Sequence, residues 1–288
     1  MILFLSALVR LLRPHQWAKN LLVFTALLTA HRWADAASLA AALRAFAVFC
    51  LAASAIYVLN DALDVRADRA HPDKRTRPFA SGALDPRLAW ALVPALLAGA
   101  ALLAWPLPDA ARLALLVYVA LALAYCLWLK RVLWLDVIAL ATLYVLRVLA
   151  GAFAIAVPPS AWLSAFALFV FASLAACKRY DELAAGGDLV GRAWRAADAP
   201  VVLALGAAAG LVAVLVLALY VQSADVRVLY ARPAWIWLAC PILLYWLGRV
   251  WTLAGRGALR GDPILYALRD PASLLTAIAL AGVFVVAL

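Results

Sequence analysis

Long apolar segments follow one another along almost the whole of this 288-residue chain, and they constrain its fold more than any other feature. Hydrophobic residues make up 69% of the sequence and charged residues only 14%. A helix that crosses a membrane needs about 20 apolar residues, which many of these segments supply. Because lipid offers no partner for backbone N–H and C=O groups, only helices or closed barrels can span it, and these segments are too long for barrel strands. The sequence therefore predicts an all-α polytopic membrane protein.

The apolar segments predict about nine transmembrane helices, which we assign to a single integral membrane domain over residues 1–288. Their predicted bounds are residues 18–31, 38–59, 88–105, 111–129, 132–156, 160–177, 199–221, 233–253 and 272–288. Ahead of them, residues 1–13 carry Arg10 and Arg13 on one side of an apolar stretch, which is typical of an interfacial amphipathic helix.

The distribution of Lys and Arg predicts the orientation of these helices. Most of the 25 basic residues lie at the N-terminus and in the loops after the second, fourth, sixth and eighth predicted helices. The opposite loops hold only Arg32, Arg112, Arg227 and Arg232. Since Lys and Arg are enriched on the cytoplasmic side, we expect a multi-pass protein of the inner cell membrane with a cytoplasmic N-terminus. The net charge of +10 follows largely from this topology and requires no nucleic-acid partner.

A charged stretch, NDALDVRADRAHPDKRTRPFASG, begins at Asn60, where the second apolar segment ends. If the helix continues past Asn60, then Asp61, Asp64 and Asp68 project from one face, since they fall at helical spacing. Carboxylates crowded in this way repel one another unless a cation compensates their charge. Mg²⁺ typically takes one or two carboxylates and completes its shell with water and substrate phosphate. We therefore predict a magnesium-diphosphate site, open to the cytoplasm, with Asn60, Asp61, Asp64 and Asp68 as its metal ligands.

Basic residues follow this acidic face directly and could hold the phosphates that the metal does not cover. The predicted phosphate-binding residues are Arg66, Lys74, Arg75 and Arg77. A cytoplasmic loop that obeys the positive-inside rule explains the basic residues equally well, but it does not explain Asp residues at helical spacing. His71 in the same stretch either donates to phosphate or is an ordinary loop residue.

Three further patches and one pair of charged residues within a predicted helix contain candidate residues. Lys19, in the segment RPHQWAKN, either anchors the chain at the membrane surface or binds a lipid phosphate. Lys130 lies in a second cytoplasmic basic patch. Arg147 shares a helix face with Asp136, about three turns away, and the two are either functional or a structural polar contact between helices.

The third patch, KRYDEL, follows the sixth predicted helix and supplies three more candidates for substrate binding. These candidates are Lys178, Arg179 and Tyr180. The loop that continues to Asp198 also carries acidic residues, so binding of metal or of phosphate alone stays open there.

The pattern NDxxDxxxD followed by KRxRP resembles the first Asp-rich motif of the UbiA superfamily of intramembrane prenyltransferases. The segments HPDKRTRPFASG, RPHQWAKN and KRYDEL are most similar to the decaprenyl-phosphate phosphoribosyltransferase branch, and the resemblance covers nearly the whole chain. Conventional members carry a second run of spaced Asp where this chain has KRYDEL. That departure favours a donor other than a prenyl diphosphate.

The resemblance implies a UbiA-like helical bundle and Mg²⁺-dependent transfer of 5-phosphoribose from phosphoribosyl diphosphate to a polyprenyl phosphate of the decaprenyl type, with release of diphosphate. Asp61, Asp64 and Asp68 would then be the catalytic residues. Two alternatives stay open: a prenyltransferase that moves a prenyl group from prenyl diphosphate to an aromatic acceptor, and a non-catalytic transporter of anionic lipids. The sequence leaves a homo-oligomer open as well.

Overall fold

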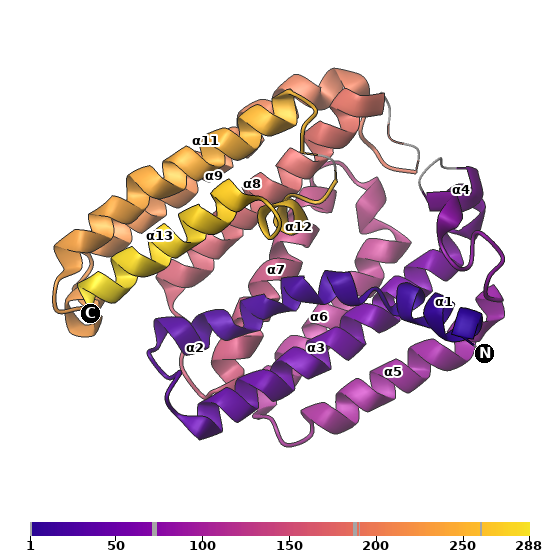
Figure 1. Ribbon diagram of the computed structural model, residues 1–288, viewed down its shortest axis with the longest axis horizontal. Coiled ribbons are helices and arrows are strands. Elements are labelled where there is room, and N and C mark those ends of the chain that lie inside the picture. The colour runs from indigo at the N-terminus through magenta and orange to yellow at the C-terminus, as the bar shows by residue number, and fades with distance from the viewer. Residues whose placement is uncertain (1, 71–73, 187–188, 190, 260) are drawn as a thin grey trace. The chain divides into compact units, whose positions relative to one another are not determined.

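The computed structural model describes residues 2–70, 74–186, 189, 191–259 and 261–288, and α- and 3₁₀-helices dominate it (Figure 1). No strand occurs among these residues, so the predicted all-α class is confirmed. The chain divides into two compact units, one containing the residues up to Leu127 together with Leu146–Pro159, the other Trp128–Val145 and Ser160–Leu288. Helix α7 (Leu135–Ala154) contributes residues to both.

The first unit is built around the long helix α3 (Ala36–Leu63), which packs against α5, α6, α1 and the 3₁₀-helix η1. The other elements of this unit are α1 (Ile2–Leu12), η1 (Pro14–Phe24), α2 (Thr25–Thr29), α4 (Val65–Ala70), η2 (Lys74–Thr76), η3 (Pro86–Leu88), α5 (Ala89–Ala104) and α6 (Asp109–Leu127). Asp35 starts α3 as its N-cap, since its carboxylate accepts a hydrogen bond from the backbone N–H of Ala37 at 3.1 Å.

The second unit is organised by helix α8 (Ala161–Gly186), which lies along α9 (Ala199–Gln222). Its remaining elements are η4 (Leu129–Arg131), η5 (Ala196–Asp198), α10 (Ala224–Leu229), η6 (Pro233–Leu238), α11 (Ala239–Gly255), α12 (Pro263–Ala267) and α13 (Pro271–Ala287). A Cβ atom on Gly206 would lie 2.6 Å from the Trp251 ring and 2.7 Å from the Ala176 Cβ, so the glycine is what lets α9 approach these neighbours.

Seven helical segments of the described chain are long and apolar enough to cross a membrane. They are Ala36–Leu63, Pro86–Ala104, Asp109–Leu127, Leu135–Ala154, Ala161–Gly186, Ala196–Gln222 and Pro233–Gly255. The ninth predicted span corresponds to α13, which is apolar but has 17 residues. The first predicted span, 18–31, is divided between η1 and α2, so it is not one continuous α-helix. The span count of nine and the cytoplasmic N-terminus stay predictions.

Candidate functional site

The Asp-rich stretch lies where α3 passes into α4. The backbone N–H of Asp64 donates to Asn60 O at 2.9 Å, and that of Asp68 donates to Asp64 O at 2.8 Å, so helical hydrogen bonding continues across the break between the two helices. The side chains of Asp61 and Asp68 are buried, at 1% and 4% exposure. Asn60 and Asp64 are half-buried.

Two arginines contact the buried carboxylates. Nη1 of Arg77 donates to Asp61 Oδ1 at 3.1 Å and to Asp68 Oδ2 at 2.7 Å. Nη2 of Arg13 donates to the same Asp61 Oδ1 at 2.5 Å. We call Arg13, Asp61, Asp68 and Arg77 the Asp–Arg cluster. Such pairing is required, because a buried charge left without a partner costs several kcal/mol.

One oxygen of Asp61 is not used by these contacts. Among the described residues, Oδ2 of Asp61 is buried and has no hydrogen-bond partner. A buried carboxylate oxygen normally accepts at least one hydrogen bond or a metal ion. This atom therefore suits a ligand that brings positive charge.

The turn between α1 and η1 directs Arg13 to this site. Arg13 has φ 53° and ψ 57°, a left-handed conformation that costs a non-glycine residue on the order of 1–3 kcal/mol. Pro14 follows and disfavours the right-handed helical conformation for the residue before it. The guanidinium also lies 5.3 Å from the centre of the Tyr57 ring, a cation–π contact that holds it beside α3.

A small apolar core holds the loop that carries Arg77. Phe79 and Leu84 are buried in one cluster with Leu11 of α1 and Val58 of α3. The loop backbone is therefore fixed against the end of α3 that bears Asp61. The charged residues of the motif are local in sequence, but this packing is what brings Arg77 to the carboxylates.

The donor set suits a hard cation, although it is not a preformed metal cage. No group of three His, Cys, Asp or Glu side chains in the described part of the chain is arranged to hold a metal ion. Mg²⁺ needs only one or two carboxylates when water and substrate phosphate complete its shell. Asp61, with its unpartnered oxygen, fits that requirement, and the metal roles of Asn60, Asp61, Asp64 and Asp68 stay predictions.

The other predicted phosphate-binding residues near this cluster differ in exposure. Arg66, Lys74 and Arg75 are exposed, as residues that meet an incoming ligand would be. Lys19 is buried, at 8% exposure. His71 lies outside the described residues.

Arg147 belongs to a second polar cluster of the same unit. Its Nε donates to Asn20 Oδ1 at 2.8 Å, its Nη2 donates to the Tyr118 hydroxyl at 2.9 Å, and the guanidinium lies 4.7 Å from the Tyr118 ring centre. Asn20 is fully buried and follows Lys19 directly. Asn20 and Tyr118 are absent from the predicted site, although an Asn at the end of RPHQWAKN inside an apolar segment is a signal that could have identified the first.

Asp136 has its own partners in the second unit. Arg179 Nε lies 2.6 Å from Asp136 Oδ2, Arg192 Nη1 donates to Oδ1 at 3.0 Å, and Trp194 Nε1 donates to Oδ2 at 2.9 Å. Asp136 and Arg179 are both fully buried, and Arg179 also pairs with Glu182. This network ties the segment after α8 to α7. Asp136 and Arg147 thus lie on one helix but bind different partners.

The remaining candidates of the second unit are half-buried: Lys130, Lys178 and Tyr180. Lys178 Nζ lies 3.7 Å from Asp262 Oδ2, and the N–H of Gly261 donates to Asp181 Oδ2 at 3.3 Å. The segment before α12 therefore packs on the end of α8. Substrate binding by Lys130, Lys178, Arg179 and Tyr180 stays a prediction.

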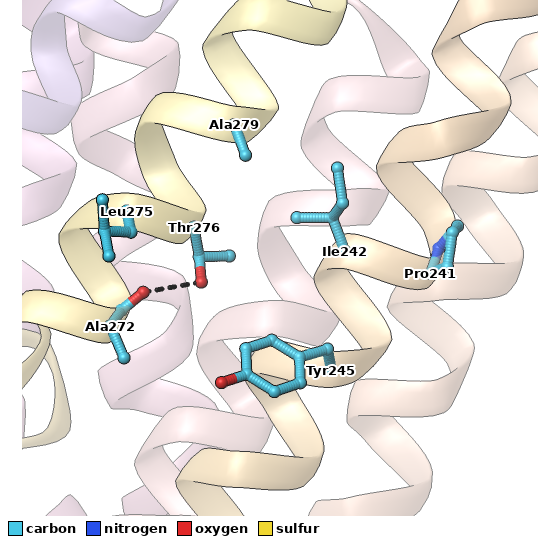
Figure 2. Close-up of a pocket in the computed structure, with 7 residues that line it drawn as sticks. All are labelled: Pro241, Ile242, Tyr245, Ala272, Leu275, Thr276 and Ala279. Carbon is cyan, nitrogen blue, oxygen red and sulfur yellow. Dashed lines mark hydrogen bonds between the residues drawn. The ribbon is translucent and has the colours of Figure 1, made fainter.

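An apolar groove of about 460 Å³ lies between α11 and α13 (Figure 2). Pro241, Ile242 and Tyr245 line it from α11, and Ala272, Leu275, Thr276 and Ala279 from α13. The Thr276 hydroxyl donates to Ala272 O at 2.7 Å, so its polarity is satisfied within the helix. With no charged lining residue, this groove is not a site for phosphate chemistry.

Comparisons with known proteins agree with the membrane fold. Residues 21–268 match the model of the UbiA prenyltransferase family. A UbiA homolog from Archaeoglobus fulgidus, solved bound to GPP and Mg²⁺, superposes with a TM-score of 0.73 at 19% identity, covering 97% of this chain and 99% of that one. At this identity the match concerns the fold alone, and it confirms the expected UbiA-like bundle.

Two curated relatives are similar in sequence. The nodulation protein NoeC of Azorhizobium caulinodans is 37% identical over 277 residues, which are 93% of this chain and 89% of NoeC. A decaprenyl-phosphate phosphoribosyltransferase of Mycolicibacterium smegmatis is 41% identical over 184 residues, which are 62% of this chain and 57% of that protein. The chain spans only 55% and 57% of the length of two of the curated relatives it matches. The family match and the coverage of NoeC establish that this multi-pass membrane chain belongs to the UbiA prenyltransferase family.

Proposed function

We propose that the chain transfers 5-phosphoribose from phosphoribosyl diphosphate to a polyprenyl phosphate and releases diphosphate. The observation that carries this proposal is the Asp–Arg cluster, a buried pair of carboxylates with one unpartnered oxygen and with exposed basic residues in the same charged stretch. Such a site suits a diphosphate that arrives with a cation. The choice of a phosphoribosyl donor rests on the likeness to the Mycolicibacterium smegmatis enzyme, whose name gives that activity.

The donor diphosphate would be held by both parts of the charged stretch. Asp61, Asp64 and Asp68, with Asn60, supply oxygen ligands for Mg²⁺. Mg²⁺ bound with the donor would neutralise negative charge on the departing diphosphate. Lys74, Arg75 and Arg77 supply donors that fit phosphate oxygens, with Arg66 at the exposed edge.

The acceptor phosphate is itself the nucleophile, so no side chain has to remove a proton from it. One of its oxygens forms a bond to C1 of the ribose while the bond from C1 to the diphosphate oxygen breaks, with inversion at C1. Lys19 and the Arg147 cluster, which belong to the same unit as the Asp–Arg cluster, are the candidates for holding that phosphate. Lys130, Lys178, Arg179 and Tyr180 of the second unit stay predicted substrate-binding residues. Apolar helix faces would accommodate the polyprenyl tail, and the reaction would face the cytoplasm of the inner cell membrane.

The second candidate function is transfer of a prenyl group from a prenyl diphosphate to an aromatic acceptor. It is favoured by the family as a whole and by the Archaeoglobus fulgidus homolog, which was solved with GPP and Mg²⁺. Both functions use the same carboxylates for a diphosphate. They differ in the group that is transferred, so the donor decides between them.

A donor test with the purified full chain distinguishes these functions. The protein in detergent, with Mg²⁺ present, receives either labelled phosphoribosyl diphosphate with a polyprenyl phosphate or labelled prenyl diphosphate with an aromatic acceptor. We expect label from the first donor to enter the lipid fraction and none to be transferred from the second. Transfer from the prenyl donor alone would contradict the proposal, and transfer from neither would favour a non-catalytic protein.

A further inference from the structure

A single nitrogen of Arg77 lies between the two buried carboxylates. Its Nη1 contacts Asp61 Oδ1 at 3.1 Å and Asp68 Oδ2 at 2.7 Å. A divalent cation that used these two oxygens together would need the space this nitrogen fills, because Mg²⁺ binds oxygen at about 2.0–2.1 Å. Arg77 and such a cation therefore exclude each other.

We propose that Arg77 is a placeholder for the cation: it neutralises Asp61 and Asp68 before the donor binds, and it moves to the donor phosphates when cation and diphosphate enter together. This inference rests on the proposed function for the identity of the ligand. It adds an order of binding, in which the cation enters with the diphosphate and not ahead of it.

The charge of the Asp–Arg cluster supports this order. Two carboxylates face two guanidiniums, so the cluster as described is balanced. A divalent cation alone would displace Arg77 without offering this partly buried guanidinium a new partner, which is unfavourable. A diphosphate supplies the negative charge and gives the guanidinium a bidentate acceptor.

The two arginines are held differently, which identifies Arg77 as the one that moves. Arg13 is fixed by its left-handed position before Pro14 and by the Tyr57 ring. Arg77 has a fixed backbone, since its N–H donates to Lys74 O at 3.0 Å and its carbonyl accepts from Ser81 N–H at 2.8 Å. Its side chain is 24% exposed, so it can rotate toward a ligand without unfolding the loop.

Rotation of Arg77 would leave a suitable oxygen set behind. Asp61 Oδ1 would keep its contact with Arg13, while Oδ2 of Asp61 is already buried with no hydrogen-bond partner in the described chain. Asp68 Oδ2 would lose the Arg77 hydrogen bond and become available. The cation would then take the place of Arg77 Nη1 between Asp61 Oδ1 and Asp68 Oδ2, with phosphate and water completing its shell.

A measurement of Mn²⁺ affinity tests whether Arg77 competes with a cation for Asp61 and Asp68. The full chain in detergent is titrated with Mn²⁺, and free Mn²⁺ is measured by electron paramagnetic resonance, without and with inorganic diphosphate. We expect wild type to bind Mn²⁺ weakly alone and more tightly with diphosphate. Arg77→Gln should bind Mn²⁺ alone at least about tenfold more tightly, because a partly buried competing charge is gone. Arg87→Gln, which removes an exposed charge ten residues along the chain, is the matched control and should behave as wild type.

A double variant tests whether the gain in Mn²⁺ affinity arises at the Asp–Arg cluster. Adding Asp61→Asn to Arg77→Gln should abolish the gain in Mn²⁺ affinity. Equal Mn²⁺ affinity of wild type and folded Arg77→Gln would overturn the placeholder while leaving the proposed function intact. The placeholder would also be overturned if diphosphate did not change the Mn²⁺ affinity of wild type. This second test does not depend on the folding of any variant. If wild type binds no Mn²⁺ even with diphosphate, the metal role in the proposed function fails too.

Discussion

At the scale of single residues, Asp61 is the centre of the candidate site. Helical spacing singled out Asp61 and Asp68, and the basic run that follows singled out Arg77, because the motif is local in sequence; their roles stay predictions. Arg13 was not among the predicted ligands. It contacts Asp61 of α3 from the turn after α1, where its own backbone is left-handed, and this contact joins residues 48 positions apart. Residues joined by such tertiary contacts cannot be identified from periodicity alone.

Asp270 has a lowered pKa, which predicts how stability depends on pH. Burial alone would raise the pKa, but hydrogen bonds from Arg249 and Ser273 lower the pKa of Asp270 to about 2. The unfolded chain has a pKa of about 3.9 there, so the stabilisation is complete above that value and is lost as pH falls toward 2. We expect Asp270→Asn to lower the thermal midpoint at pH 7 and the gap to wild type to narrow by pH 3.

Thermal unfolding of the detergent-solubilised protein measures this difference. Asp109→Asn is the control, because Asp109 is 91% exposed and its pair with Arg112 lies on the surface, where ion pairs contribute little. A gap for Asp270→Asn that stays constant from pH 7 to pH 3 would contradict the role of its charge.

At the scale of elements, helix positions followed from apolar length better than helix ends did. The predicted span 160–177 becomes α8, which continues to Gly186 because Glu182, Leu183 and Ala184 are good helix formers although the segment is charged. The predicted span 18–31 is interrupted, since η1 is a 3₁₀-helix. Hydrophobicity reports burial in lipid and carries no information on the hydrogen-bonding pattern of the backbone.

Close packing at Gly151 gives a prediction at this scale. A Cβ atom there would lie 1.9 Å from Val23 O, so α7 approaches the backbone of η1 only because residue 151 is glycine. We expect Gly151→Ala to destabilise the protein by about 1–3 kcal/mol through overpacking. Gly282→Ala in α13 is the matched control: nothing lies within 4 Å of its Cβ position, so only the helix propensity of Ala is gained, up to about 1 kcal/mol.

Chemical denaturation of the two variants in the same detergent measures both effects. The free energy of unfolding should be lower than that of wild type for Gly151→Ala, and equal to or higher than that of wild type for Gly282→Ala. A stable Gly151→Ala protein would show that η1 can shift away from α7 at little cost.

At the scale of the whole molecule, the sequence predicted the membrane class and the helical fold, because both depend on apolar segments repeated along the chain. It predicted the family because that resemblance rests on local motifs. The structure divides the chain into two compact units, each with a core of its own, where the sequence was assigned to a single domain. The sequence also placed Asp136 and Arg147 on one helix face without showing that each belongs to a different unit. The single-domain assignment therefore stays a prediction.

The most direct test of the central claim measures transfer of label from phosphoribosyl diphosphate to a polyprenyl phosphate by the intact chain, with Mg²⁺ and with excess chelator. We predict transfer that requires the metal and falls at least about 100-fold in Asp61→Asn, since loss of a charged ligand removes electrostatic stabilisation of the departing diphosphate. Asp85→Asn should keep wild-type activity, because Asn is as good an N-cap as Asp for η3. Transfer that survives the chelator, or that Asp61→Asn retains in full, would contradict the account.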